Sequence, residues 1–334
     1  MPKPFRIAVI GAGAIAQTSH LPAFAKAPEA LLQAVVDADV ERASAAALRW
    51  HAPMFSARID DVLDSIDGAI LCVPNHLHEP LAVRLLEKGK AVLCEKPLAR
   101  NPSEAHRMAE AAQKYGALLM PAFIMRQSAT LKWVRKNAPW KKSGLIRVRA
   151  FYGLSWNWDF SSRYAFDRVQ AGGGALIDLG SHLLDALFWT LDAERAECAV
   201  YSDDGESGLE AEGEGELRLN IPENNKTVPC RFGVSRVRPL ANLIEYDMPE
   251  GTLIVPLNGK RVFWRFRDGG TRNVSVPKAT DPFVAQLRVF VSAARENPPR
   301  QQDGKMLLLP ETIAALYAMR RPLTLFWKDY SPCP

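Results

Sequence analysis

The sequence predicts an α/β domain built on a parallel sheet, followed by a second domain of α+β type. Short apolar runs alternate with helical segments through the first half of the chain, and strand-like segments dominate the second half. The length of 334 residues exceeds the usual size of a single hydrophobic core. We therefore expect two domains, at 1–123 and 124–334.

The first domain follows a β-α-β pattern, in which each short apolar run indicates a buried strand. The expected strands are 5–10, 31–37, 69–74, 91–95 and 117–123, and the expected helices are 14–26, 40–50, 78–88 and 102–115. The second half begins with a helix near 131–136 and a strand at 145–153. A glycine-rich stretch then opens a helix, strands dominate 196–266, and two helices follow near 281–296 and 303–321.

Composition excludes several classes of protein. The net charge of +5 is small for this length and gives no general case for nucleic acid. The five cysteines form no C-x-x-C pair, so we expect reduced thiols, no metal site and a cytoplasmic location. The N-terminus shows no signal region and no apolar run is long enough to span a membrane.

The turn after the first expected strand has the pattern of a dinucleotide-binding loop. Gly11 permits a tight turn, Gly13 lets a pyrophosphate approach the backbone, and the small Ala16 allows the helix to pack closely on the sheet. Ala14 and Ile15 complete the loop. The strand, the helix and an acid at the end of the second strand coincide, as this motif requires.

That acid is Asp37, which can accept hydrogen bonds from both adenosine ribose hydroxyls. Its carboxylate would repel a 2′-phosphate, Ala38 offers no cation and Asp39 adds negative charge. NAD is therefore favoured over NADP, although Arg42 one turn later could soften the preference.

The glycine-rich stretch places Asp178 and His182 four residues apart on one helix, so both side chains share a face. A carboxylate beside an imidazole can orient the ring and stabilise its positive charge, as a general base requires.

With these motifs the chain resembles the glucose-fructose oxidoreductase and inositol dehydrogenase (Gfo/Idh/MocA) family of nicotinamide-dependent enzymes. The motifs that carry the resemblance are the Gly11 turn, Val73-Pro74-Asn75-His76-Leu77-His78, Glu95-Lys96-Pro97 and the helix with Asp178 and His182. The resemblance covers nearly the whole chain. It implies an NAD(P)-dependent dehydrogenase or reductase of a sugar, sugar derivative or cyclitol, whose second domain is an open, mostly antiparallel sheet.

The resemblance also implies residue roles. Lys96 leaves the carboxyl end of a strand, where its ammonium can reach the reacting oxygen, and the Lys96-Pro97 bond is expected to be cis. Glu95 would position Lys96 or the ribose. Pro74, Asn75 and His78 would lie at the nicotinamide half of the cofactor.

The chemistry implied is hydride transfer between a secondary alcohol and the nicotinamide. His182 would take the hydroxyl proton and Lys96 would stabilise the developing alkoxide. In some relatives the lysine is assigned the proton transfer, so both assignments stay open. Asp178 would either hold a neighbouring substrate hydroxyl or orient His182.

Aromatic and hydrogen-bonding side chains upstream of the glycines suit a sugar ring, although they could equally pack a loop onto the core. Among them we expect Trp158, Arg163 and Tyr164 to contact substrate. Arg126 matches an arginine that relatives often carry, but Gln127-Ser128 follows where relatives usually have an aromatic residue.

The acidic run alternates with period two, which places Glu210, Glu212, Glu214 and Glu216 on one face of a strand. This face could be solvated, or it could form a polar dimer interface with arginines such as Arg231 or Arg236 opposite the glutamates. Because relatives often associate through this sheet, we expect a homodimer or homotetramer.

Two other functions stay open for this sequence. One is a glycosidase that retains NAD and uses transient oxidation to cleave a glycosidic bond. The other is a non-catalytic NAD(P)-binding sensor of the same fold, against which the retention of Lys96, Asp178 and His182 argues.

Overall fold

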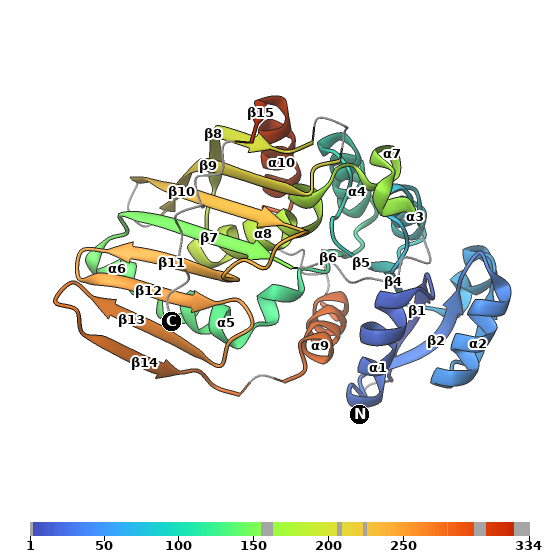
Figure 1. The fold of residues 1–334 in the computed structure, drawn as a ribbon. Helices are drawn as coiled ribbons and strands as arrows, with labels where there is room; N and C mark the ends of the chain where they lie inside the picture. The colour runs from blue at the N-terminus through green and yellow to red at the C-terminus, as the bar shows by residue number, and fades with distance from the viewer. Residues whose placement is uncertain are drawn as a thin grey trace. The chain divides into compact units, whose positions relative to one another are not determined.

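The computed structural model describes residues 3–154, 163–205, 209–222, 226–278, 280–296 and 305–323. The chain forms two compact units. The first comprises Met1–Ile124 with Thr280–Leu307, and the second comprises Met125–Ala279 with Leu308–Pro334. Figure 1 traces the elements of both units.

The first unit is built on a parallel sheet. Its strands are β1 (Phe5–Ile10), β2 (Ala30–Val36), β3 (Met54–Ser56), β4 (Gly68–Leu71), β5 (Ala91–Cys94) and β6 (Leu119–Pro121). Their spatial order is β3-β2-β1-β4-β5-β6, and every neighbouring pair is parallel. The winding reverses between β1 and β4, and in such a sheet ligands bind beyond the carboxyl ends of the strands at this point. The predicted α/β class is confirmed, although the short edge strand β3 was not predicted.

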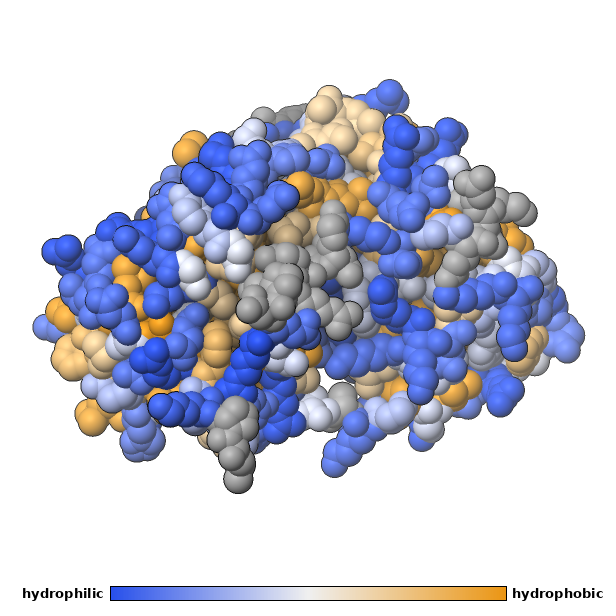
Figure 2. All heavy atoms as spheres, turned by 180° about the vertical axis from the view of Figure 1, so that it is seen from behind, coloured by the Kyte–Doolittle hydropathy of each residue, from blue (hydrophilic) through white to orange (hydrophobic). Residues whose placement is uncertain are grey.

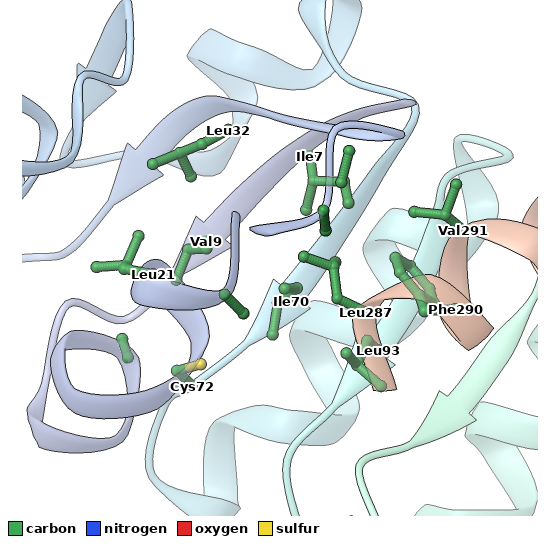
Figure 3. Packing of buried hydrophobic residues seen from close by; sticks show 14 of the residues in the cluster. Ile7, Val9, Leu21, Leu32, Ile70, Cys72, Leu93, Leu287, Phe290 and Val291 are labelled. Carbon is green, nitrogen blue, oxygen red and sulfur yellow. The ribbon is translucent and has the colours of Figure 1, made fainter. Parts of the chain in front are cut away.

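Helices cover both faces of this sheet. They are α1 (Leu21–Ala23), α2 (Val40–Trp50), α3 (His78–Glu87), α4 (Pro102–Tyr115) and α9 (Pro282–Arg295). Side chains of β1 alternate between two cores, with Ile7 and Val9 in one and Ala8 and Ile10 in the other. Figure 3 shows the first core, where Leu287, Phe290 and Val291 of α9 join residues of the sheet. The helix α9 therefore packs on the first unit although it comes late in the sequence.

Local signals explain where these helices begin and end. The Asn101 side chain accepts a hydrogen bond from the Glu104 N–H, Pro102 occupies the first turn of α4, and Gly116 ends the helix in the left-handed region. The segment expected as one helix at 14–26 is helical but irregular. It contains a π-helical turn at Ala16–His20, then α1, then a 3-10 turn at Phe24–Lys26. Pro22, which has no N–H to donate, lies two residues after the π-helical turn.

The second unit is built on a mixed, mostly antiparallel sheet. Its strands are β7 (Arg147–Gly153), β8 (Arg195–Asp203), β9 (Glu212–Ile221), β10 (Lys226–Ser235), β11 (Leu243–Met248), β12 (Gly251–Pro256), β13 (Arg261–Phe266), β14 (Thr271–Ser275) and β15 (Arg320–Pro322). Their order is β14-β13-β12-β11-β7-β10-β9-β8-β15. Only the pairs β7 with β10 and β8 with β15 are parallel among the described strands. This arrangement confirms the predicted class of the second domain.

Four of the described helices lie on one face of this sheet (Figure 1), namely α5 (Ala129–Asn137), α6 (Trp140–Ser143), α8 (Ser181–Leu191) and α10 (Leu308–Ala318). The short helix α7 (Arg168–Ala171) instead contacts the 3-10 turn at Arg163–Phe166. The helix α8 is almost wholly buried, and it contacts α5, α10 and β7. Because α8 is packed on several sides, the backbone at its first turn is held in place.

The acidic run differs from its prediction. Glu210, Glu212 and Glu214 are buried, with exposed fractions of 1%, 8% and 1%. Glu216 is partly exposed, and its Oε1 lies 2.7 Å from Nε of Arg231. The solvated-face interpretation is therefore wrong for the first three glutamates. Protein groups replace water at two of them, since Glu210 accepts hydrogen bonds from two backbone N–H groups and Tyr317, and Glu212 pairs with Ser235 and Arg238. The dimer interpretation stays a prediction.

Hydrophilic side chains cover most of the face shown in Figure 2, and apolar side chains form patches between them. Among the residues that the structure describes, Leu48 and Val169 are the most exposed large apolar side chains, at 81% and 76%. No helix in these parts of the chain combines the length and apolar character that a bilayer span requires.

Candidate functional site

The turn after β1 needs a glycine at one position and leaves space at another. Gly11 has φ +92°, and a Cβ there would overlap the carbonyl oxygen of Cys72. A Cβ at Gly13 would meet no atom within 4 Å. Ala16 is fully buried, which allows the following helix to pack on the sheet. Gly11 is therefore required by the fold, whereas Gly13 leaves open space beside the turn.

Asp37 follows β2 directly and stabilises this turn. Its Oδ2 accepts a hydrogen bond of 2.8 Å from the Ala12 N–H, and its Oδ1 accepts one of 3.0 Å from the Asp39 N–H. Arg42 Nη1 lies 3.3 Å from the same Oδ1, and this arginine also pairs with Asp39. Its half-exposed guanidinium thus adds a cation beside the carboxylate that was expected to reject a 2′-phosphate.

A buried ion pair lies at the carboxyl end of β5. Glu95 Oε1 is 2.7 Å from Nε2 of His20, which comes from the helical segment after the glycine turn. Glu95 Oε2 accepts a hydrogen bond of 3.0 Å from the Lys96 N–H. The Lys96-Pro97 peptide bond is cis, as the family resemblance implied.

The two partners hold each other in the charged state. Burial opposes the imidazolium, but contacts with Cys72 and Glu95 outweigh burial and raise the pKa of His20 to about 10. Burial alone would raise the pKa of Glu95, but the hydrogen bond and charge of His20 lower it overall. The backbone that presents Lys96 is therefore anchored to an ion pair that links two parts of the first unit.

The motif after β4 forms a 3-10 turn at Asn75–Leu77 that leads into α3. Asn75 is buried and Pro74 is partly exposed. His78 is fully buried, and its ring nitrogens lie 2.8 and 2.9 Å from the carbonyl oxygens of Pro97 and Val73. This geometry gives His78 a supporting role at the turn after Lys96, which differs from the cofactor contact that the resemblance implied.

In the second unit, a buried carboxylate fixes the glycine-rich turn. Glu210 Oε1 accepts hydrogen bonds from the Gly174 N–H at 3.1 Å, the Leu176 N–H at 2.9 Å and the Tyr317 hydroxyl at 2.6 Å. A Cβ at Gly174 would overlap the Glu210 backbone, and one at Gly173 would overlap the Tyr317 hydroxyl. The glycines are needed because Glu210 and Tyr317 occupy the space beside them.

Asp178 lies in a π-helical turn at Leu176–Gly180, and α8 with His182 follows at once. The expected regular helix therefore begins with one wide turn. Arg236 donates from Nε to Oδ2 of Asp178 at 3.2 Å, and its Nη2 lies 3.2 Å from the same oxygen. The ring of His182 meets the ring of Tyr152 edge to face, with centroids 6.2 Å apart.

The expected substrate residues occupy different settings. Arg126 makes a two-point ion pair with the buried Asp185 of α8, with contacts of 2.7 Å and 3.0 Å. Arg163 is exposed and Tyr164 is partly buried in a 3-10 turn at Arg163–Phe166. Trp158 lies outside the described residues.

Comparison with known proteins identifies the family. A model described as the oxidoreductase family with an NAD-binding Rossmann fold, Gfo/Idh/MocA, matches residues 5–123. The chain is 30% identical over 305 residues to dTDP-3,4-didehydro-2,6-dideoxy-alpha-D-glucose 3-reductase of Streptomyces violaceoruber, covering 88% of this chain and 86% of that enzyme. The chain belongs to the Gfo/Idh/MocA family of oxidoreductases.

Other members of the Gfo/Idh/MocA family match in part or at greater distance. D-glucoside 3-dehydrogenase of Escherichia coli K12 is 31% identical over 200 residues, which cover 56% of this chain and only 54% of that enzyme. The structure of KijD10, a 3-ketoreductase from Actinomadura kijaniata in complex with NADP and TDP-benzene, has a TM-score of 0.83. It is 23% identical and covers 96% of this chain and 99% of that chain, so it supports the shared fold.

Four residues of this Gfo/Idh/MocA protein were missed as site residues by the sequence interpretation: His20, Glu210, Arg236 and Tyr317. Each supports a residue that a motif did identify. Arg236 was expected opposite the glutamates but pairs with Asp178 instead. A signal existed for Glu210, since a strand-like run with an acid at every second position requires either water or partners on that face.

The two glycines of the turn should respond differently to alanine. Gly11→Ala is expected to lower the free energy of unfolding by about 3 kcal/mol or more, because it combines backbone strain with a clash. Gly13→Ala should change stability by less than about 0.5 kcal/mol, because its Cβ meets open space. Urea unfolding measures both, and calorimetry should show NADH binding weakened in the stable Gly13 variant. Equal destabilisation by the two substitutions would contradict this interpretation.

His20→Gln should destabilise the protein by about 3 kcal/mol or more near neutral pH, because it leaves Glu95 buried without its cation. The raised pKa of His20 means that its contribution is fully present below about pH 6.5 and is lost as pH rises through about 10. The difference in unfolding free energy between wild type and variant should therefore shrink over that range in urea titrations. The exposed His51, replaced by Asn, provides the control and should show no such trend.

Proposed function

We propose that this protein is an NAD(P)-dependent oxidoreductase that transfers a hydride between the nicotinamide and a secondary alcohol or ketone of a sugar, sugar derivative or cyclitol. The observation that carries the proposal is Lys96, held by the Glu95–His20 pair at the carboxyl end of a Rossmann strand. Asp178 and His182 at the start of α8 add the proton-transfer groups. The names of relatives, which include D-glucoside 3-dehydrogenase and a scyllo-inositol 2-dehydrogenase, support this substrate class.

The first unit offers what a dinucleotide requires. Open space at Gly13 accommodates a pyrophosphate, and we assign the ribose hydroxyls to the Asp37 carboxylate, which also accepts the Ala12 N–H of the same turn. When bound, the nicotinamide would supply the hydride acceptor or donor. We assign the cofactor to 1–123, and the substrate and subunit contacts to 124–334.

Three side chains of the protein then take different parts in the reaction. His182 takes the hydroxyl proton, and its ring is oriented by packing against Tyr152. The Lys96 ammonium stabilises the oxygen on which negative charge develops, an effect that needs a fixed cation rather than a mobile one. A proton transfer through Lys96 is the alternative assignment. Asp178, anchored by Arg236, accepts a hydrogen bond from a substrate hydroxyl or from His182.

We infer a preference for NAD over NADP from Asp37. Its carboxylate is mostly buried, so a 2′-phosphate brought to it would face an unscreened like charge. Arg42 offsets part of this repulsion through its contacts with both Asp37 and Asp39. The preference is therefore expected to be moderate.

We also infer a cytoplasmic homodimer or homotetramer that associates through the open sheet. The face opposite the helices carries charges in pairs, which include Glu216 with Arg231 at 2.7 Å and Glu245 with Arg149 at 2.9 Å. Such a surface suits a polar contact between copies. The described cysteines are free thiols, which fits a reducing compartment.

Lys96→Ala and His182→Ala should each lower turnover by on the order of a hundred-fold or more, because each removes a group that acts as charge and proton move. NADH affinity should change little in either variant. Steady-state assays over a panel of sugars and cyclitols, with calorimetry for NADH, measure both effects. The double variant should lose less than the product of the single losses if the two residues serve one step. Near-normal turnover in both single variants would exclude this mechanism, and release of a glycoside without net NADH would indicate a glycosidase instead.

Asp37→Ser should relax cofactor choice by improving NADP binding relative to NAD, because it removes the like charge. Calorimetric titration of both cofactors into wild type and variant gives the ratio directly. Arg42→Gln is the matched counterpart and should sharpen the preference for NAD. Equal affinity of the wild type for NAD and NADP would refute the preference.

A further inference from the structure

Asp178 is anchored by an arginine from a distant part of the second unit. Arg236 follows β10, and both its Nε and its Nη2 lie 3.2 Å from Oδ2 of Asp178. The Arg236 side chain is 7% exposed and that of Asp178 is 23% exposed. A pair this poorly hydrated is screened weakly by water, so each charge strongly affects the other.

The backbones of both partners are fixed to the same short segment. The Arg236 N–H donates to the carbonyl oxygen of Ala211 at 2.8 Å, which extends the ladder between β9 and β10 by one residue. The neighbouring Glu210 accepts the Ala175 N–H at its carbonyl oxygen, also at 2.8 Å. Its side chain accepts the N–H groups of Gly174 and Leu176. Arg236 and Asp178 therefore meet with little freedom in either backbone.

The loop that carries Arg236 has a second support. Ser235 Oγ donates to Glu212 Oε1 at 2.7 Å and accepts the Arg238 N–H at 2.9 Å. Arg238 in turn pairs with Glu212 through its side chain. Arg238 thus holds the loop through Glu212, whereas Arg236 pairs with Asp178.

We propose that Arg236 is a positioning residue for the reaction, which keeps Asp178 ionised and oriented so that it serves only as a hydrogen-bond acceptor beside His182. This inference rests on the proposed function. An adjacent cation favours the carboxylate over the carboxylic acid, and two contacts from one guanidinium hold Oδ2 of Asp178 in place. Without the guanidinium, Asp178 would become protonated at a higher pH than in the wild type. Activity would therefore begin to fall at a higher pH as the solution is acidified.

The test compares pH profiles of kcat/KM for the wild type, Arg236→Gln, Arg236→Lys and Arg238→Gln. The charged and titratable groups near Asp178 are Arg236, His182 of α8, and Glu210 and Tyr317 beside the glycine turn. Loss of the charge in Arg236→Gln should move the acid limb upward by about one pH unit or more, with NADH affinity unchanged. Arg236→Lys should restore most of the position of that limb. Arg238→Gln, which loosens the loop but leaves the Asp178 pair, should not move it.

Two further variants make the result decisive. Because burial raises the pKa of Glu210, Glu210→Gln identifies any part of the acid limb that belongs to that group. Asp178→Asn should restore part of the melting temperature lost in Arg236→Gln, but none of the loss in Arg238→Gln, because Arg236 pairs with Asp178 whereas Arg238 pairs with Glu212. An active wild type whose acid limb is the same in Arg236→Gln would overturn this inference alone. A wild type without turnover on the whole substrate panel would overturn the proposed function, and this inference with it.

Discussion

The need to satisfy carboxylates buried in the protein shapes both parts of the candidate site. A carboxylate removed from water is tolerated only with hydrogen-bond donors or a cation around it. Glu95 obtains His20 and the Lys96 N–H, and Glu210 obtains Tyr317 with two backbone N–H groups. In each case a donor belongs to the segment that carries a proposed catalytic side chain. The hydrogen bonds that satisfy each buried carboxylate therefore also restrain the position of the neighbouring segment.

Much of the fold was predictable because its signals are local. The strand β1, the glycine turn and the capped helix α4 each depend on residues within a few positions of one another. The edge strand β3 escaped prediction because three residues give no period to detect. The wide turn at Ala16–His20 escaped because helical patterning does not distinguish a π turn from a regular one.

The candidate site also contains residues that local motifs predict and residues that they do not. Gly11, Asp37, Lys96, Asp178 and His182 stand in motifs that the sequence displays directly. Their supports do not, since His20 is 75 residues from Glu95, Arg236 is 58 from Asp178, and Glu210 is 36 from Gly174. Such pairs depend on which strands become neighbours, and a single sequence carries no local record of that choice.

The acidic run shows how a correct period can yield a wrong environment. Alternation identifies which side chains share a face of a strand, but exposure depends on what covers that face. Here Glu210 fixes the glycine turn, Glu212 fixes the loop after β10, and Arg236 extends from that loop to Asp178. The donors that satisfy Glu210 and Glu212 come from the segments that these side chains hold in place. The acidic segment that resembled a solvated surface is therefore a support for the helical segment that carries the proposed catalytic residues Asp178 and His182.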